Sequence, residues 1–292
     1  MGRKRQLAGM RMLITGASQG IGRALARAAC QRGAWVLATA RSGDLLQQLR
    51  QEAQGFPGRL ETQVADVTLS QDRHCMLDAA VEQFGGLDIL INNAGIGATG
   101  HFSDASEERL RRIFEVNFFG PAELIRSAIP WLRQGRTPLI VNISSVVGLR
   151  AVPARSEYSA SKFALQGLSE ALRAELVRHG IDVLVVSPGL TATNFPNNMI
   201  ENKARWPMDH KRSMLPEQVA EATLQAIEKG RNNLVLTWEG KMLVWLNRLV
   251  PWFVDWLMAR KVYQLYCDEI ESRHHPQPPV SQSEPATTAK SS

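Results

Sequence analysis

A tyrosine and a lysine on one face of a predicted helix carry the clearest chemical signal in this sequence. Tyr158 and Lys162 are four residues apart, so their side chains lie on the same side of an α-helix. The pKa of a phenol is ordinarily about 10, and a nearby cation lowers it by favouring the ionised form. Tyr158 is therefore a candidate proton donor tuned by Lys162. An exposed helical pair is the alternative, because this spacing often arises by chance.

Two polar residues upstream extend this group. Ser145 follows a buried-type apolar run, so its hydroxyl is expected at the carboxyl end of a strand, where it can hydrogen-bond a substrate carbonyl. Asn117 lies within a helical stretch, competes with the backbone for hydrogen bonds, and could hold a water near Lys162. An ordinary helix-boundary asparagine is the alternative for Asn117.

Seven short apolar runs predict the elements that position these side chains. From Met10 to about Val186 the runs alternate with helical stretches, which is typical of βαβ units with right-handed crossovers. The predicted strands cover 10–15, 35–40, 60–65, 87–92, 138–143, 181–186 and 233–237. The sequence therefore predicts an α/β fold, in which a doubly wound, Rossmann-type, mostly seven-stranded parallel sheet carries helices on both faces.

A glycine-rich segment after the first predicted strand has the features of a phosphate-binding turn. Its glycines allow a tight turn, so that a pyrophosphate can approach the free amide groups of a helix N-terminus. The spacing is GxxxGxG rather than the usual GxGxxG, and an ordinary glycine-rich turn is the alternative. The expected cofactor contacts in this segment are Gly16, Ser18, Gln19, Gly20, Ile21 and Gly22.

The end of the second predicted strand favours NADP over NAD. A dinucleotide fold that prefers NAD places an acidic residue there to hold the ribose hydroxyls, whereas this chain reads Thr39-Ala40-Arg41. A guanidinium holds a 2′-phosphate, while a carboxylate repels it. Asp44 is the competing acidic residue, but its position at the start of the next helix suits a cap. We predict NADP(H) as the cofactor.

Two further strand ends present polar residues at the same edge of the predicted sheet. Ligands bind at the carboxyl ends of strands in open α/β sheets, although Asp, Asn and Gly are also ordinary turn residues. The expected cofactor contacts at these two ends are Asp66, Val67, Asn93, Ala94 and Gly95.

Together these motifs resemble the short-chain dehydrogenase/reductase family. The set TGxxxGIG, NNAG, a mid-helix asparagine, Ser145, YxxxK and Pro188-Gly189 runs in this order from about Met10 to Thr193. The resemblance implies a catalytic tetrad and a nicotinamide site. The tetrad would be Asn117, Ser145, Tyr158 and Lys162, of which Tyr158 and Lys162 would also contact the cofactor. The contacts on the nicotinamide side would be Pro188, Gly189, Thr191 and Thr193.

The resemblance also bears on cofactor choice and reaction. The Ala40-Arg41 pair looks like the NADP-preferring branch, in which 2′-phosphate binding would rest mainly on Arg41, with Arg23 as a second candidate. The implied reaction is hydride transfer from NADPH to a carbonyl carbon, with Tyr158 protonating the alkoxide; positioned proton transfer contributes about 10²–10⁴-fold. A non-catalytic NADP-binding sensor or scaffold, and an NADP-cycling epimerase or lyase, stay open. No metal is expected, because the histidines lack ligand spacing.

The chain beyond Gly189 bears on the substrate. An irregular loop over about 190–213 favours a bulky, lipid, steroid or acyl type of carbonyl through its apolar residues. These are Phe195, Met199, Ile200, Trp206 and Met208. Its basic residues either meet an anionic group or merely solvate the surface, and they are Lys203, Arg205, Lys211 and Arg212.

An aromatic and apolar segment follows the last predicted strand. Between Lys241 and Tyr266 no charge-free run reaches the roughly 18 residues of a transmembrane helix. Aromatic residues with basic flanks suit an interfacial amphipathic helix, broken near Pro251. Packing over the substrate cleft, or a surface buried in a homodimer or homotetramer, is the alternative.

Length and composition set the organisation of the chain. With 292 residues and 44% hydrophobic content, one domain with a tail is expected. We predict a basic leader at 1–9, a Rossmann-type NADP-binding and catalytic domain at 10–240, an apolar and aromatic helical extension at 241–271, and a disordered tail at 272–292. The net charge of +6 is dispersed, so nucleic acid is not an expected partner. Three scattered cysteines and no recognisable signal peptide favour a cytoplasmic location, with membrane-surface association through 241–266.

Overall fold

Seven parallel strands form one sheet in the computed structural model, which describes residues 2–205 and 213–274. Their order is β3-β2-β1-β4-β5-β6-β7, and every neighbouring pair is parallel. The strands are β1 (Arg11–Thr15), β2 (Trp35–Ala40), β3 (Arg59–Val64), β4 (Ile89–Asn92), β5 (Leu139–Ile143), β6 (Asp182–Ser187) and β7 (Asn233–Val235). All seven predicted strands are present with small shifts at their ends, and the predicted fold is confirmed.

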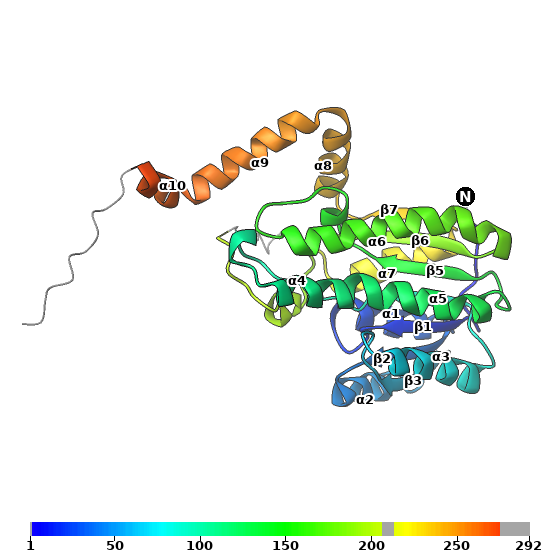
Figure 1. Cartoon of the computed structure of the whole chain (residues 1–292). Helices are drawn as coiled ribbons and strands as arrows, with labels where there is room; N and C mark the ends of the chain where they lie inside the picture. The colour runs from blue at the N-terminus through cyan, green and yellow to red at the C-terminus, as the bar shows by residue number, and fades with distance from the viewer. Residues whose placement is uncertain (1, 206–212, 275–292) are drawn as a thin grey trace, which may run out of the picture.

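Helices cover both faces of this sheet, as Figure 1 shows. One apolar core joins the sheet to α1 (Gly20–Gln31), α2 (Gly43–Glu52) and α7 (Pro216–Glu228). The other joins it to α3 (Ser70–Phe84), α5 (Gly120–Leu132) and the turn after α6 (Ser156–Glu175). Along β1, Met12 and Ile14 face the first core and Leu13 the second, as the alternation of side chains in a strand requires. This two-core arrangement defines a doubly wound fold.

The strand order reverses between β1 and β4. The chain runs outward from β1 through β2 to β3, then returns to place β4 on the other side of β1. The loops after β1 and β4 therefore leave the sheet in opposite directions and open a crevice between them, which is where ligands bind in such folds. Two of the segments that the sequence assigns to the cofactor, residues 16–22 and 93–95, follow these two strands.

The predicted basic leader is part of the folded body. Leu7 is buried, and the amide of Gly2 donates to the carbonyl of Gly230 at 2.9 Å. The guanidinium of Arg5 is buried and donates to the Thr137 carbonyl at 2.7 Å and to Asp182 at 2.6 Å. The first residues therefore close the sheet at the amino ends of β5 and β6.

Three helices form the C-terminal extension, namely α8 (Trp238–Leu249), α9 (Pro251–Leu265) and α10 (Cys267–His274). The Thr237 hydroxyl accepts a hydrogen bond from the Gly240 amide at 3.1 Å and caps α8. This cap ends β7 earlier than predicted and starts the extension ahead of residue 241. The break falls at Pro251 as predicted, whereas α10 continues past the predicted boundary at 271.

Figure 1 shows α8 and α9 standing away from the layered body. We call this pair of helices the arm. Arg150 attaches it to the body through Asn247 at 3.0 Å and Asp255 at 2.8 Å. No helix in the described part of the chain is both long and apolar enough to cross a membrane. The rest of the predicted tail, 275–292, lies outside the described residues.

Candidate active site

A cavity of about 460 Å³ opens at the carboxyl ends of the strands, at the reversal between β1 and β4. Nearly all residues that the sequence assigns to the site line it. The two exceptions are Gly22 and Asn117, which pack behind its wall. The crevice therefore brings together residues that are spread along the chain from the first strand to beyond the sixth.

The glycine loop, residues 15–22, is held tightly against the segment after β4. Gly16 has a φ of +67°, and a Cβ there would lie 2.7 Å from the Ala94 Cα. A Cβ on Gly22 would lie 2.3 Å from the Gly16 carbonyl oxygen, so Gly22 serves this packing and does not face the cavity. Asn93 locks the turn by donating from Nδ2 to the carbonyls of Thr15 and Gly16, both at 3.0 Å.

The first turn of α1 has the chemistry of an anion site. Gln19 at its N-cap makes no capping hydrogen bond, and the first turn carries no acidic residue. The orphan amides of a helix N-terminus then attract negative charge. A dinucleotide pyrophosphate fits this turn, because the glycines leave the backbone accessible.

Arg41 lies at the end of β2 as predicted, lines the cavity, and is 62% exposed. Its nearest described carboxylate is Asp66, at 4.0 Å, which leaves the guanidinium available to a phosphate. The second predicted cation is placed differently. Arg23 donates to Glu52 at 2.8 Å and to the Leu45 carbonyl at 3.2 Å, and does not line the cavity, because its side chain turns toward α2.

Tyr158 and Lys162 project from α6 into the cavity. The Lys162 ammonium is buried, donates to the Ile143 carbonyl at 3.0 Å, and lies 5.8 Å from the centre of the Tyr158 ring. Burial lowers the pKa of Lys162 to about 8. The ammonium form therefore still predominates at neutral pH.

The pKa of Tyr158 differs from the sequence-based expectation. Burial raises it to about 12, against the opposing effects of a hydrogen bond with Ser145 and the charge of Arg155. The prediction was that Lys162 lowers this pKa. In the structure desolvation has the larger effect, and the cation that acts on the phenol is Arg155. Tyr158 stays protonated at neutral pH, as a proton donor must.

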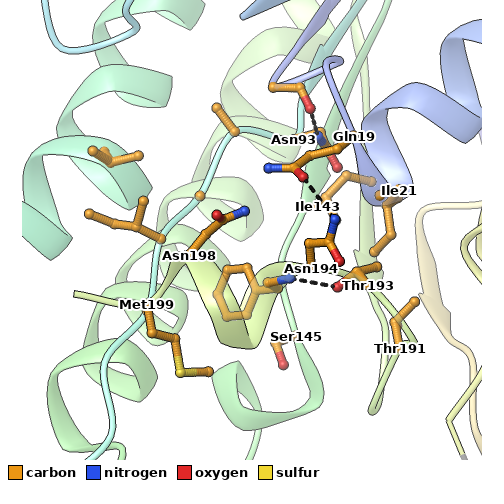
Figure 2. Close-up of a pocket in the computed structure, with 18 of the residues that line it drawn as sticks. Gln19, Ile21, Asn93, Ile143, Ser145, Thr191, Thr193, Asn194, Asn198 and Met199 are labelled. Atoms are coloured by element: carbon orange, nitrogen blue, oxygen red, sulfur yellow. Dashed lines mark hydrogen bonds between the residues drawn. The ribbon is translucent and has the colours of Figure 1, made fainter. Parts of the chain in front are cut away.

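Ser145 stands on the cavity wall directly after β5. Its Oγ accepts from the Val147 amide at 3.3 Å and donates to the Pro188 carbonyl at 3.5 Å. Figure 2 shows Ser145 and Met199 on the opposite side of the cavity from Gln19 and Asn93. The two sides correspond to the predicted chemical and phosphate-binding ends.

Asn117 lies in a π-helical turn, Glu115–Phe119, between α4 (Glu107–Phe114) and α5. It is fully buried, accepts from the Ile96 amide at 2.9 Å, and donates to the Ile96 carbonyl at 2.9 Å and to Ser161 Oγ at 3.0 Å. The side chain thus bonds to protein groups, and the water near Lys162 that the sequence suggested stays a prediction. It fixes the loop after β4 against α6 beside Tyr158.

The described part of the predicted substrate loop (190–213) forms the remaining wall, through residues between Leu190 and Met199. Phe195 packs on the Tyr158 ring with 5.7 Å between ring centres, and Met199 lines the cavity beside it. Figure 2 shows Asn194 of this loop joined to Gln19 by a hydrogen bond of 3.3 Å. Ile200 is 39% exposed and does not line the cavity, and Trp206 and Met208 lie outside the described residues.

Backbone hydrogen bonds hold the substrate loop in place. The Ile200 amide donates to the Gly97 carbonyl at 2.9 Å, and the Thr99 amide to the Glu201 carbonyl at 2.8 Å. At the base of the loop, the Ala192 amide donates to the Met214 carbonyl at 2.8 Å. This bond joins the two ends of the loop, and we call this point the neck. These bonds hold Phe195 against the Tyr158 ring, with Met199 beside it.

The described basic residues of the substrate loop do not line the cavity, whereas one arginine that was not predicted does. Lys203 lies 3.5 Å from Glu201, and Arg205 binds Asp268 at 2.8 Å, so both described basic residues of the substrate loop are paired. Lys211 and Arg212 lie outside the described residues. Sequence reasoning missed Arg155, which lines the cavity. Its spacing of three residues before Tyr158, one helical turn, was the available signal.

A buried ion pair beside Tyr158 was also missed. Arg109 binds Glu157 and Glu201, at 2.5 and 2.6 Å, and so joins α4, α6 and the substrate loop. The Arg109 and Glu157 side chains are each 2% exposed. The three residues are far apart in the sequence, so no local pattern predicts their contact.

A doubly wound sheet with such a cavity at its strand reversal defines a dinucleotide-binding α/β protein. Comparison with known proteins agrees: the model of the short chain dehydrogenase family matches residues 10–204. Dehydrogenase/reductase SDR family member 7B of Bos taurus is 35% identical over 274 residues, 90% of this chain and 83% of that protein. The chain therefore belongs to the short-chain dehydrogenase/reductase family of oxidoreductases, as its motifs predicted.

Two solved structures are similar to this one. An alcohol dehydrogenase from the archaeon Thermococcus sibiricus, complexed with 5-hydroxy-NADP, is 26% identical with a TM-score of 0.69, and the match covers 77% of this chain and 94% of that one. A 3-ketoacyl-(acyl-carrier-protein) reductase from Brucella melitensis, complexed with NADH, is 27% identical with a TM-score of 0.71, covering 79% and 97%. Similar structures thus hold cofactors both with and without the 2′-phosphate that distinguishes NADP from NAD.

Proposed function

We propose that this protein is an NADPH-dependent oxidoreductase that reduces the carbonyl group of apolar substrates. One observation carries the proposal: Tyr158, Ser145 and Lys162 line one end of a cavity whose other end holds the glycine loop and Arg41. The first end has a proton donor, a hydroxyl and an ammonium. The second has free amides and a guanidinium, which suit a phosphorylated dinucleotide.

The proposed chemistry depends on three side chains. When bound, NADPH supplies the hydride, and the protein supplies orientation and electrostatics. Ser145 donates a hydrogen bond to the carbonyl oxygen, and Tyr158 transfers its proton to that oxygen as negative charge develops there. We assign to the Lys162 ammonium, which the Ile143 carbonyl holds 5.8 Å from the centre of the Tyr158 ring, part of the positive charge that stabilises the phenolate as it forms.

The cofactor contacts follow from the lining of the cavity. We assign the pyrophosphate to the glycine loop, the adenosine end to Arg41, Asp66 and Val67, and the nicotinamide end to the chain from Pro188 to Thr193. Because similar structures bind either form, the preference for NADP rests on Arg41 and on the lack of an acidic residue at the end of β2.

The substrate end favours an apolar carbonyl compound. Phe195, Met199 and Leu190 line the cavity, and Phe195 packs on the Tyr158 ring. Apolar surface that closes around a ligand binds it with roughly 25 cal/mol per Å² removed from water. Ketones and aldehydes with a long or bulky hydrocarbon part are therefore the proposed substrates.

A panel of carbonyl compounds, followed by NADPH absorbance, tests this function. We expect steady consumption with medium-chain ketones or aldehydes, and a loss of about 10²–10⁴-fold in Tyr158→Phe, which lacks the transferable proton. Tyr263→Phe is the matched control, because Tyr263 lies exposed on α9 and should keep wild-type activity.

Three results would contradict the proposed function. Tight NADPH binding with no turnover of any carbonyl indicates a sensor or scaffold. Product formation without net NADPH loss indicates an epimerase or lyase. Full activity in Tyr158→Phe contradicts the assigned proton donor, whichever substrate is reduced.

The arm supports a second proposal, that the protein binds membrane surfaces peripherally. Exposed apolar residues recur on it every three or four positions, at Trp238, Met242, Trp245, Leu249, Trp252 and Trp256. Each is more than half exposed. From Lys241 to Tyr266 four residues are basic and only Asp255 is acidic, so an anionic lipid surface is the proposed partner.

Vesicle co-sedimentation tests this membrane proposal. Wild type should sediment with phosphatidylglycerol-containing vesicles and much less with pure phosphatidylcholine, and Trp245→Gln with Trp252→Gln should abolish sedimentation while keeping activity on a soluble ketone. Equal sedimentation of the double variant contradicts the proposal. If wild type ignores vesicles and the double variant instead turns a homodimer or homotetramer into a monomer, the arm is a subunit interface.

A further inference from the structure

Arg155 stands out among the arginines around the active site. Neighbouring arginines have carboxylate partners: Arg109 binds Glu157, and Arg205 binds Asp268. Among the side chains that the structure describes, in residues 2–205 and 213–270, no carboxylate lies within ion-pair distance of Arg155, although its side chain lines the cavity. A partly buried guanidinium without a protein partner is an electrostatic cost that a bound anion can remove.

The fold places Arg155 firmly. It is the N-cap residue of α6, and its carbonyl accepts from the Ser159 amide at 2.8 Å. The preceding Ala154 has a φ of +59°, a left-handed conformation that residues other than glycine rarely adopt. The Ala154 carbonyl accepts from the Gly100 amide at 3.0 Å, which ties this turn to the loop after β4. The backbone that presents the guanidinium is therefore strained and held at both sides.

Arg155 lies at the chemical end of the cavity and not at the cofactor phosphates. It precedes Tyr158 by one turn, which separates Cβ atoms by about 5–6 Å, and its charge acts on the phenol. The phosphate-binding elements, the glycine loop and Arg41, line the other end. An anion that pairs with Arg155 would thus belong to the substrate, a short distance from the carbonyl that Tyr158 protonates.

We propose that Arg155 binds a carboxylate on the substrate and thereby selects apolar carbonyl compounds that carry this group within a few bonds of the carbonyl. The inference rests on the proposed reductase function and deepens it. A guanidinium forms two parallel hydrogen bonds with a carboxylate, which fixes the direction in which the substrate enters. The apolar remainder of the substrate then extends along Phe195 and Met199.

A matched pair of substrates tests this assignment. 4-Oxodecanoic acid and its methyl ester share the ketone and hydrocarbon chain and differ in charge. We expect the wild-type enzyme to reduce the acid with the higher kcat/KM. Arg155→Met should lower kcat/KM for the acid by about 10- to 100-fold more than it lowers kcat/KM for the ester, because only the acid loses a charged hydrogen bond.

Two further variants separate binding from folding. Arg155→Lys keeps the charge and should recover part of the preference for the acid. Arg178→Met removes an exposed arginine near the far end of α6 and should leave both substrates unaffected. Calorimetric titration of the acid into each variant with NADP⁺, which cannot reduce a ketone, gives a readout without turnover, and the acid should bind about 10- to 100-fold more weakly to Arg155→Met.

The outcomes distinguish this inference from the function on which it rests. If wild type reduces the ester as well as the acid, or if Arg155→Met lowers both equally, Arg155 acts through Tyr158 and the inference is overturned while the reductase function stands. If neither compound nor any other carbonyl is reduced, the proposed function fails. The calorimetric titration then still decides whether Arg155 binds the carboxylate.

Discussion

The two ends of the sheet differ in whether their charged side chains have partners of opposite charge. At the amino end, the fully buried carboxylate of Asp88 binds Arg11 at 2.6 Å, and Asp182 binds the buried Arg5 at 2.6 Å. At the carboxyl end, Lys162 and Arg155 have no carboxylate partner among the residues that the structure describes, and Arg41 has one only at 4.0 Å.

This difference separates charges that stabilise the fold from charges available for ligands. A buried ion that keeps its partner in the folded state contributes to cohesion, and removing that partner is costly. A cation left without a partner lowers stability until a ligand supplies the opposite charge. Substitutions at the amino end should therefore change stability, whereas those at the carboxyl end should change activity.

Lys162→Met should produce the largest effect. The variant loses the cation beside Tyr158, so we expect kcat/KM to fall by about 10³-fold, within the range of acid–base catalysis. Its free energy of unfolding should stay the same or rise, because a buried charge without a counter-ion is removed. Urea unfolding and steady-state kinetics measure the two quantities. A variant that was both inactive and strongly destabilised would contradict the assignment of activity, and not stability, to charges at the carboxyl end of the sheet.

Asp88→Asn should have the reverse effect at the amino end. Loss of the carboxylate leaves Arg11 without its partner, and we expect the free energy of unfolding to fall by about 3 kcal/mol while the folded enzyme keeps its kcat. Glu107→Gln, which breaks an exposed pair with Arg111, is the control and should change stability little. A similar loss in both variants would contradict the assigned difference between buried and surface pairs.

The same carboxylate predicts how stability depends on pH. Burial raises the pKa of Asp88, but hydrogen bonds from Arg11 and Arg136 outweigh that effect, and the net pKa lies below its ordinary value. The stabilisation is therefore complete above the unfolded-state pKa and is lost as pH falls through the folded-state value. Thermal melting below about pH 4 should show a steeper decline for wild type than for Asp88→Asn.

Arg41→Ala should have a smaller effect, confined to the cofactor. We expect the preference for NADPH over NADH to fall about 10- to 100-fold through a higher KM for NADPH, with little change in kcat. Arg50→Ala, which removes a cation paired with Glu61 outside the active-site cavity, should keep the preference. An unchanged ratio in Arg41→Ala would remove the basis for the NADP assignment.

The smallest effect, counted per pH unit, is the change in kcat/KM as Lys162 loses its proton. Because its pKa is lowered to about 8, the ammonium is lost as pH rises through that value, and kcat/KM for reduction should then fall by up to about tenfold per pH unit. Tyr158, with a pKa of about 12, stays protonated over this range and adds no second limb. A flat profile between about pH 7 and about pH 10 would contradict this assignment.

The elements and the clustered motifs could be predicted because local patterns encode them. Apolar runs marked the strands, and glycine, Asn-Asn-Ala-Gly and Tyr-Lys spacings marked the ends that meet at the cavity. Tertiary packing decided the rest. The left-handed conformation of Ala154 orients Arg155, and the π-helical turn buries Asn117. The Arg23 side chain binds Glu52, so it is not available to a cofactor phosphate as predicted.

The pKa of Tyr158 shows the same limit in energetic terms. Its spacing from Lys162 was visible in the sequence, and the attraction between an ammonium and a phenolate follows from it. Desolvation depends on every group that surrounds the ring, including Phe195 from a distant loop. A sequence pattern therefore indicates which groups meet, whereas their surroundings decide the direction of the shift.

The neck of the substrate loop has an evolutionary consequence. Because the Ala192 amide and the Met214 carbonyl join the two ends of the loop, the chain enters and leaves it at one point next to the sheet. Lengthening a loop whose ends are already joined adds little closure entropy, about 0.6 kcal/mol for each doubling. We therefore expect related enzymes to tolerate changes in the length and sequence of this segment while the fold around Tyr158 and Lys162 is kept.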